Sequence, residues 1–83
     1  MILVQIDIPV LQRKLDFSLN EYAPVQNLIH EIIQILQKKY NDDLDDSMAE
    51  GFDIYVKSQE LCLERDTTLA EHGVVDGTEL LLV

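Results

Sequence analysis

The sequence is poor in cysteine and in basic residues, and both shortages narrow the class of protein. Cys62 is the only cysteine, so no disulfide can form within the chain, and we expect a protein of a reducing compartment. Six Lys and Arg residues stand against sixteen Asp and Glu residues, which gives a formal net charge of −10. Binding to phosphates or to anionic lipid needs clustered basic residues. We therefore expect no nucleic acid and no lipid surface as a direct partner.

The sequence also lacks a long hydrophobic run. No stretch reaches the roughly 18 apolar residues that a membrane-spanning helix needs. The first ten residues alternate around Asp7 and contain no basic stretch, so a signal peptide is not expected. We expect a cytoplasmic protein without direct membrane insertion. Its 83 residues suffice for one domain, 1–83, and an apolar content of 47% suffices for a core.

The apolar residues near the start of the chain recur with a period of two. Every second residue is apolar over 2–8 and again over 15–19, which predicts two half-buried strands. Pro9 cannot donate a hydrogen bond to a neighbouring strand, so it marks the end of the first one. The two strands are therefore predicted to form a hairpin.

Between Pro24 and Lys39 the apolar period changes to that of an α-helix. Pro24 suits the first helical position, where its missing N–H costs nothing, and Lys38 and Lys39 complement the helix dipole at the other end. The apolar stripe, with its last two members on the edges, consists of Val25, Leu28, Ile29, Ile32, Leu36, Ile33 and Ile35. We expect this stripe to pack on a sheet as core and not to bind a partner.

The second half of the chain alternates again, over residues 52–57 and briefly over 61–63. A last apolar strand follows the turn at Asp76-Gly77. The expected order is strand, strand, long helix, strand, short strand, helical turn, strand, with the first and last strands adjacent at the centre of one sheet. This order predicts an α+β fold in which one helix covers one face of a mixed sheet of four to five strands.

That arrangement is the β-grasp fold of ubiquitin, and three stretches resemble the EsaB/YukD group of ubiquitin-like proteins. They are LDFSLNEYAPVQNLI, VKSQELCL and LAEHGVVDGTELLLV. In the last stretch, Thr68 and Glu71 suit a capping box and Gly73 suits the left-handed C-cap of a single helical turn. The likeness extends over residues 2–83 and implies one ubiquitin-like domain.

The EsaB/YukD group is encoded with bacterial type VII (WXG100, ESAT-6-like) secretion systems. The resemblance implies a non-catalytic accessory or regulatory component that acts by protein–protein interaction. Its partner would be a cytosolic part of the secretion membrane complex or of the secretion ATPase. The protein itself would be a monomer or a weak homodimer, cytoplasmic or peripheral to the membrane complex.

An acidic run, Asp42, Asp43, Asp45 and Asp46, follows the predicted helix. The carboxylates come as adjacent pairs, whereas an EF-hand loop alternates its ligands and has glycine where this chain has Ser47. We expect a solvated loop over 41–50 and no metal site. An electrostatic contact to a basic partner is the alternative.

No constellation of catalytic side chains stands out. Cys62 has no predicted base beside it and is expected to be a half-buried thiol. His30 is expected on the outer face of the helix and His72 on the surface of the helical turn. We predict that the protein is not an enzyme and holds no cofactor.

The sheet face turned away from the helix is the predicted binding site. By alternation, Leu3, Tyr55, Leu81 and Val83 point to that face, and the expected strand order would set them side by side. Contiguous exposed apolar residues with a tyrosine among them are typical of a protein-docking surface. Ordinary surface and a homodimer contact are the alternatives.

Two other functions compete with a role in secretion. One is a ubiquitin-like interaction module unrelated to secretion. The other is a modifier or sulfur carrier, which would need a flexible tail ending in Gly-Gly. Val83 falls within the last predicted strand instead, so we expect a protein that is not conjugated.

Overall fold

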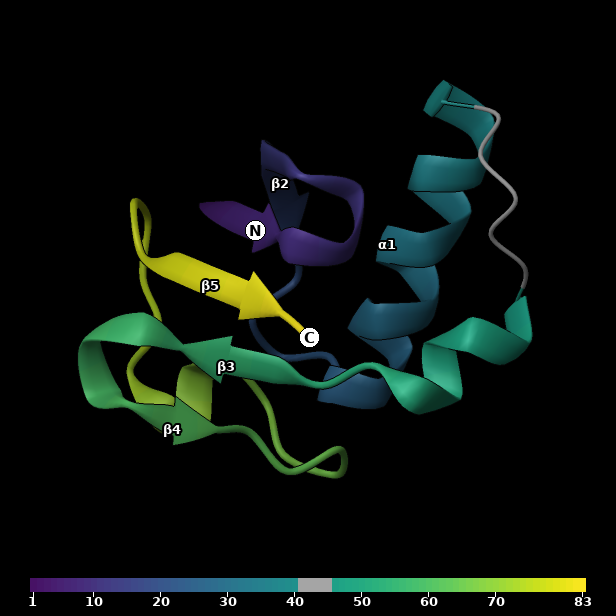
Figure 1. Ribbon diagram of the computed structural model, residues 1–83. Helices are drawn as coiled ribbons and strands as arrows, with labels where there is room; N and C mark the ends of the chain where they lie inside the picture. The colour runs from purple at the N-terminus through teal and green to yellow at the C-terminus, as the bar shows by residue number, and fades with distance from the viewer. Residues whose placement is uncertain (41–45) are drawn as a thin grey trace.

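Five strands form one mixed sheet, and one long helix, α1 (Val25–Tyr40), lies against one of its faces (Figure 1). The computed structural model describes residues 1–40 and 46–83. The strands are β1 (Ile2–Ile8), β2 (Arg13–Leu19), β3 (Ile54–Val56), β4 (Leu61–Cys62) and β5 (Glu79–Leu82). They lie in the order β2-β1-β5-β3-β4, which is the β-grasp arrangement predicted from the sequence.

The two central strands, β1 and β5, come from opposite ends of the chain. β1 pairs with β2 in an antiparallel hairpin and with β5 in parallel, where Ile6 lies opposite Leu80. On its other side β5 pairs antiparallel with β3. The prediction that the first and last strands are neighbours is therefore confirmed.

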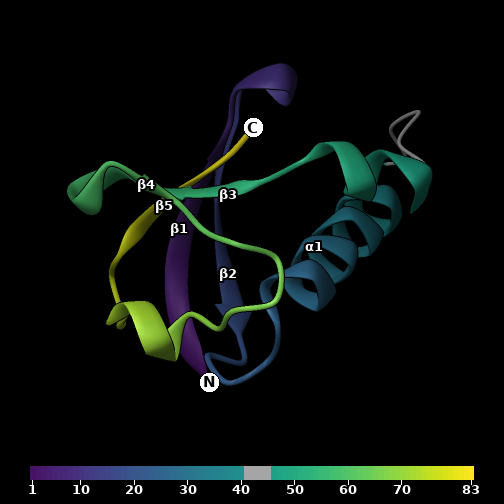
Figure 2. The ribbon, with the colours of Figure 1, turned by 90° about the horizontal axis from the view of Figure 1, so that it is seen from below.

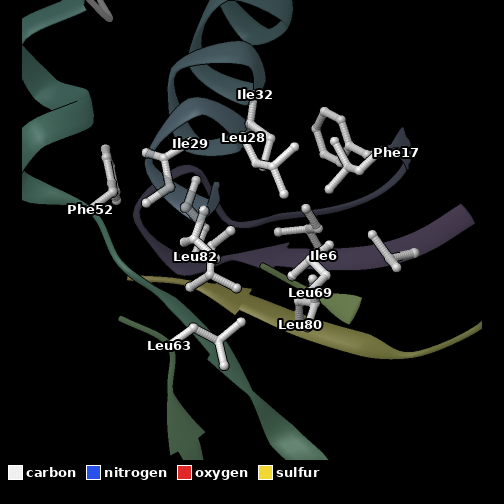
Figure 3. Packing of buried hydrophobic residues seen from close by; sticks show 14 of the residues in the cluster. Ile6, Phe17, Leu28, Ile29, Ile32, Phe52, Leu63, Leu69, Leu80 and Leu82 are labelled. Atoms are coloured by element: carbon white, nitrogen blue, oxygen red, sulfur yellow. The ribbon is translucent and has the colours of Figure 1, made fainter. Parts of the chain in front are cut away.

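The core lies between this sheet and α1 (Figures 2 and 3). Leu80 and Leu82 of β5 are fully buried, and Figure 3 shows them on the side of the sheet that faces Leu28 and Ile32 of the helix. The helical stripe predicted from the sequence is buried except at one edge, where Ile35 is 36% exposed. The stripe is thus core, as expected, and Ile35 is its outlier.

The start of α1 is held by backbone groups from the second half of the chain. Helical structure begins at Val25, one residue after the predicted Pro24. The first amides of a helix lack partners within it, and here Val25 N–H donates to the carbonyl of Thr67 at 2.8 Å and Gln26 N–H to that of Arg65 at 3.0 Å. The loop between β4 and η4 therefore caps the helix.

Short 3₁₀ turns replace several expected strand ends and loops. They are η1 (Pro9–Leu11), η2 (Asp46–Gly51), η3 (Lys57–Gln59) and η4 (Ala70–His72). The predicted third strand, 52–57, keeps only Ile54–Val56, and η3 begins directly after it at Lys57. The predicted fourth strand, 61–63, likewise keeps only Leu61–Cys62.

The predicted helical turn near the end of the chain is confirmed as η4. The hydroxyl of Thr68 accepts a hydrogen bond from Glu71 N–H at 3.2 Å, and Gly73 adopts the left-handed conformation with φ of 71°. In the acidic run, Asp42, Asp43 and Asp45 lie outside the described residues. Asp46 begins η2.

Candidate protein-binding face

One row of side chains crosses the sheet on the face turned away from α1, with one residue from each strand. The pairing registers place Lys14, Asp7, Leu81, Tyr55 and Cys62 opposite one another in that order, from β2 to β4. Directly paired residues in a sheet point to the same face. The row is charged over β2 and β1 and apolar or aromatic over β5 and β3.

An ion pair borders the apolar half of the row. Lys57 Nζ lies 3.4 Å from Asp7 Oδ2, and their side chains are 32% and 33% exposed. Because β5 lies between β1 and β3, this pair reaches across β5 next to Leu81. A partly exposed pair of this kind contributes about 0–1 kcal/mol to stability, so its main effect is to place two opposite charges beside Tyr55 and Leu81.

Three of the four predicted site residues lie together. Tyr55 and Leu81 are direct cross-strand partners, and both are half-buried. Val83 lies beside the row, two residues after Leu81. Its backbone exchanges two hydrogen bonds with Asp53, at 2.7 and 3.0 Å, and its side chain is 49% exposed. We refer to Tyr55, Leu81 and Val83 as the outer patch.

Leu3 does not join the outer patch, although it is 54% exposed. Its carbonyl accepts a hydrogen bond from Gly77 N–H at 2.8 Å, which aligns Leu3 with a residue two positions before β5 begins and four before Leu81. The polar pair of Gln5 and Glu79 lies between the two positions. The expectation that all four residues lie side by side is therefore wrong for Leu3.

A shallow hollow lies between η3 and the residues that lead into β5. Its volume is about 450 Å³, and it is lined by Lys57, Ser58, Gly77, Thr78 and Glu79. The outer patch is consequently a compact apolar area at one end of the sheet face, with a polar surface along one side.

The other candidate side chains in the described part of the chain lie outside the outer patch or serve the fold. Cys62 is exposed and not half-buried as expected, because it lies on the edge strand β4 with its side chain on the outer face. His72 is half-buried, and its Nε2 lies 3.2 Å from Thr67 Oγ1. Within residues 1–40 and 46–83, no three His, Cys, Asp or Glu side chains come close enough to hold a metal ion.

Arg65 is a structural residue that the sequence did not indicate. Its Nη2 donates to the backbone carbonyls of Ala49, Glu50 and Phe52, and its Nε lies 3.7 Å from Asp53 Oδ1. Arg65 lies in the loop that caps α1, and it thereby ties this loop to η2 and to the residues that precede β3. It positions β3 and hence Tyr55.

The chain matches the model of one protein family over nearly its whole length. The model of the WXG100 protein secretion system (Wss) protein YukD matches residues 3–82. The chain belongs to the YukD family. The resemblance noted in the sequence is thus confirmed, and it associates this ubiquitin-like protein with type VII secretion. Comparison with curated proteins finds no significant match.

Solved ubiquitin-like structures resemble the fold of this YukD-family chain. The N-terminal ubiquitin-like domain of the 4931431F19Rik protein has a TM-score of 0.69 at 20% identity, with 99% of this chain and 72% of that chain covered. The ubiquitin-like domain of Arabidopsis thaliana protein At2g32350 has a TM-score of 0.72 at 17% identity, with 99% and 74% covered.

A third structure, ATBAG1 in complex with HSP70, has a TM-score of 0.70 at 16% identity, with 100% of this chain and 40% of that chain covered. At these identities the likeness concerns the fold alone. Separately, α1 falls short of the length and hydrophobicity of a membrane-crossing helix, and the rest of the described chain contains no other candidate.

Proposed function

We propose that this YukD-family protein is a non-catalytic regulatory component of a type VII secretion system and acts by docking its outer patch on another protein. The partner in this proposal is a cytosolic segment of the secretion membrane complex or of the secretion ATPase. Family membership supports the link to secretion. The pairing of Tyr55 with Leu81 on the open sheet face is the observation that supports the docking mode.

The composition of the outer patch suits a protein interface. Tyrosine supplies a large, rigid and amphipathic contact area, and it is enriched among residues that dominate binding energy. The Asp7–Lys57 pair next to Leu81 provides both signs of charge at the border, as in the polar rim of an interface. A partner with an apolar centre and flanking charges would fit this surface.

The test compares three forms of the full chain in a host whose own gene is deleted. The forms are the wild type, the double variant Tyr55→Ala with Leu81→Ser, and the control Val75→Ser. Val75 is an aliphatic residue that is 61% exposed and lies in the loop before β5, away from the outer patch. The control therefore removes a comparable apolar surface elsewhere.

Two readouts separate binding from folding. We expect the double variant to keep a cooperative thermal transition but to lose co-purification with the secretion components and to change the export of WXG100 substrates. Loss of two central interface side chains weakens binding by about 2 kcal/mol or more, roughly thirtyfold in Kd. A folded double variant with unchanged co-purification and export would refute docking through the outer patch.

A further inference from the structure

β2 forms one edge of the sheet, and its outer side is open within the described part of the chain. All of its backbone pairing goes to β1, over seven residues, whereas β4 at the other edge is only two residues long. A long open edge presents unpaired N–H and C=O groups that can pair with another strand. β2 is therefore the edge at which an added strand has room to bind.

A groove lies beside this edge, between β2 and α1. Its volume is about 240 Å³, and most of its lining is apolar. Phe17 and Leu36 form a buried floor, while Leu15 is half-buried and Ile35 is 36% exposed. Ile35 is the one exposed member of the helical stripe, and it faces the groove. An apolar side chain of a ligand would bury both Leu15 and Ile35 there.

The charge around the groove differs from that of the rest of the molecule. β2 and α1 together contain four of the six basic residues and only two of the sixteen acidic ones, Asp16 and Glu31. Lys39 lines the groove, next to Lys38 at the end of the helix, and Arg13 and Lys14 begin β2. Arg13 and Lys39 also interact within the chain. Their charge nevertheless makes this edge the most basic part of an acidic protein.

We propose that the groove between β2 and α1 binds an extended segment of a partner protein that adds to β2 as a sixth strand and carries acidic residues beside its apolar core. Alternate side chains of an extended segment point to the same side, so every second residue would enter the groove. Backbone pairing with β2 supplies affinity, and the groove selects apolar side chains. The basic ends of β2 and α1 favour acidic flanks.

A second copy of this chain is a poor occupant of the same edge. Asp16 is the middle residue of β2, so antiparallel pairing of two β2 strands about their centres would place two Asp16 side chains opposite each other. Like charges directly opposite destabilise a strand pair. Each copy also has a formal net charge of −10, which opposes self-association.

The groove and the outer patch are separate surfaces. The groove lies over β2 and α1, whereas Tyr55, Leu81 and Val83 lie on β3 and β5 and on the opposite face of the sheet. Substitutions can therefore remove one without touching the other. The proposal does not depend on the role of the outer patch.

The experiment is an NMR titration of the full ¹⁵N-labelled chain with a synthetic acetylated peptide, Glu-Glu-Val-Thr-Val-Thr-Val-Glu-Glu. Four control peptides accompany it: one with serine for each valine, one with lysine for each glutamate, one N-methylated at the valines and one N-methylated at the threonines. A paired strand uses the amides of alternate residues on one edge only. The N-methylated pair therefore distinguishes strand addition from nonspecific apolar contact.

We expect chemical shift changes in the amides of Leu15, Asp16, Phe17 and Ile35. One N-methylated peptide should bind about tenfold more weakly than the parent, because it loses edge hydrogen bonds, while the other binds normally. The serine and lysine peptides should both bind more weakly. Equal binding of both N-methylated peptides, or shifts that map outside the groove, would overturn strand addition.

Variants of the protein complete the test. Ile35→Ser should weaken binding of the peptide about fivefold to tenfold, since it removes an exposed wall of the groove. Val75→Ser, at an exposed aliphatic residue outside both surfaces, serves as the matched control and should leave binding unchanged. Asp16→Lys should tighten binding of the acidic peptide, because it replaces a negative charge by a positive one on the edge strand with which the peptide would pair. If Asp16→Lys weakens or does not change binding, the charge preference is wrong.

Discussion

At the scale of single residues, Arg65 illustrates how one side chain can hold two segments together. It donates to three backbone carbonyls, those of Ala49, Glu50 and Phe52. We expect Arg65→Ala to lower the free energy of unfolding by about 2–3 kcal/mol, since hydrogen bonds from a charged donor are lost. Urea denaturation measures this change. Arg65→Lys is the matched variant, and it should recover only part of the loss because an ammonium cannot reach all three acceptors.

Two glycines, Gly73 and Gly77, have φ of 71° and 85°, and a Cβ on either would meet no atom within 4 Å. Substitution by alanine therefore tests backbone strain without a steric clash. We expect Gly73→Ala and Gly77→Ala each to cost about 1 kcal/mol of unfolding free energy. Gly51 also has open space but no positive φ, so Gly51→Ala should leave stability unchanged or slightly higher. Equal losses at all three positions would contradict this explanation.

At the scale of elements, adjacent residues of β5 face opposite sides of the sheet and have different roles. Leu82 is fully buried beneath α1, whereas Leu81 is half-buried on the outer face. We expect Leu82→Ala to lower the free energy of unfolding by about 3 kcal/mol and Leu81→Ala by about 1 kcal/mol or less. Chemical denaturation of both variants measures the contrast. A loss at Leu81 as large as that at Leu82 would mean that the outer patch stabilises the fold and is not a free surface.

The same elements show what could be predicted from the sequence. Alternation places Leu3 and Leu81 on the same face correctly, because side chains in a strand have a period of two. It does not give the register of β1 against β5. That register depends on contacts in the preceding turn, where Asp76 Oδ1 accepts from Leu3 N–H at 2.7 Å and Gly77 N–H donates to the Leu3 carbonyl.

Arg65 escaped prediction for a related reason. Its acceptors are backbone carbonyls 13 to 16 residues earlier in the chain, and every residue has a carbonyl, so no side-chain pattern marks them. Ile35 was different, because its place on the edge of the helical stripe was visible in the sequence. Only the structure shows that this edge borders a groove beside the open strand β2.

At the scale of the whole molecule, charge is distributed unevenly over a small fold. Outside β2 and α1, only two basic residues, Lys57 and Arg65, stand among fourteen acidic ones. Both are already engaged in ion pairs, with Asp7 and Asp53. Most carboxylates of this part of the molecule therefore repel one another, and that repulsion favours the expanded, unfolded chain.

This distribution predicts that salt stabilises the protein. Raising NaCl from about 0.02 M to about 0.2 M shortens the screening length to below about 10 Å, and we expect the melting temperature to rise by a few degrees. Calorimetry at both salt concentrations measures the effect. A variant with Asp66→Asn and Glu71→Gln, two exposed carboxylates, should be more stable than the wild type at low salt and respond less to NaCl. An equal salt response in both proteins would mean that specific ion binding, and not relief of repulsion, stabilises the fold.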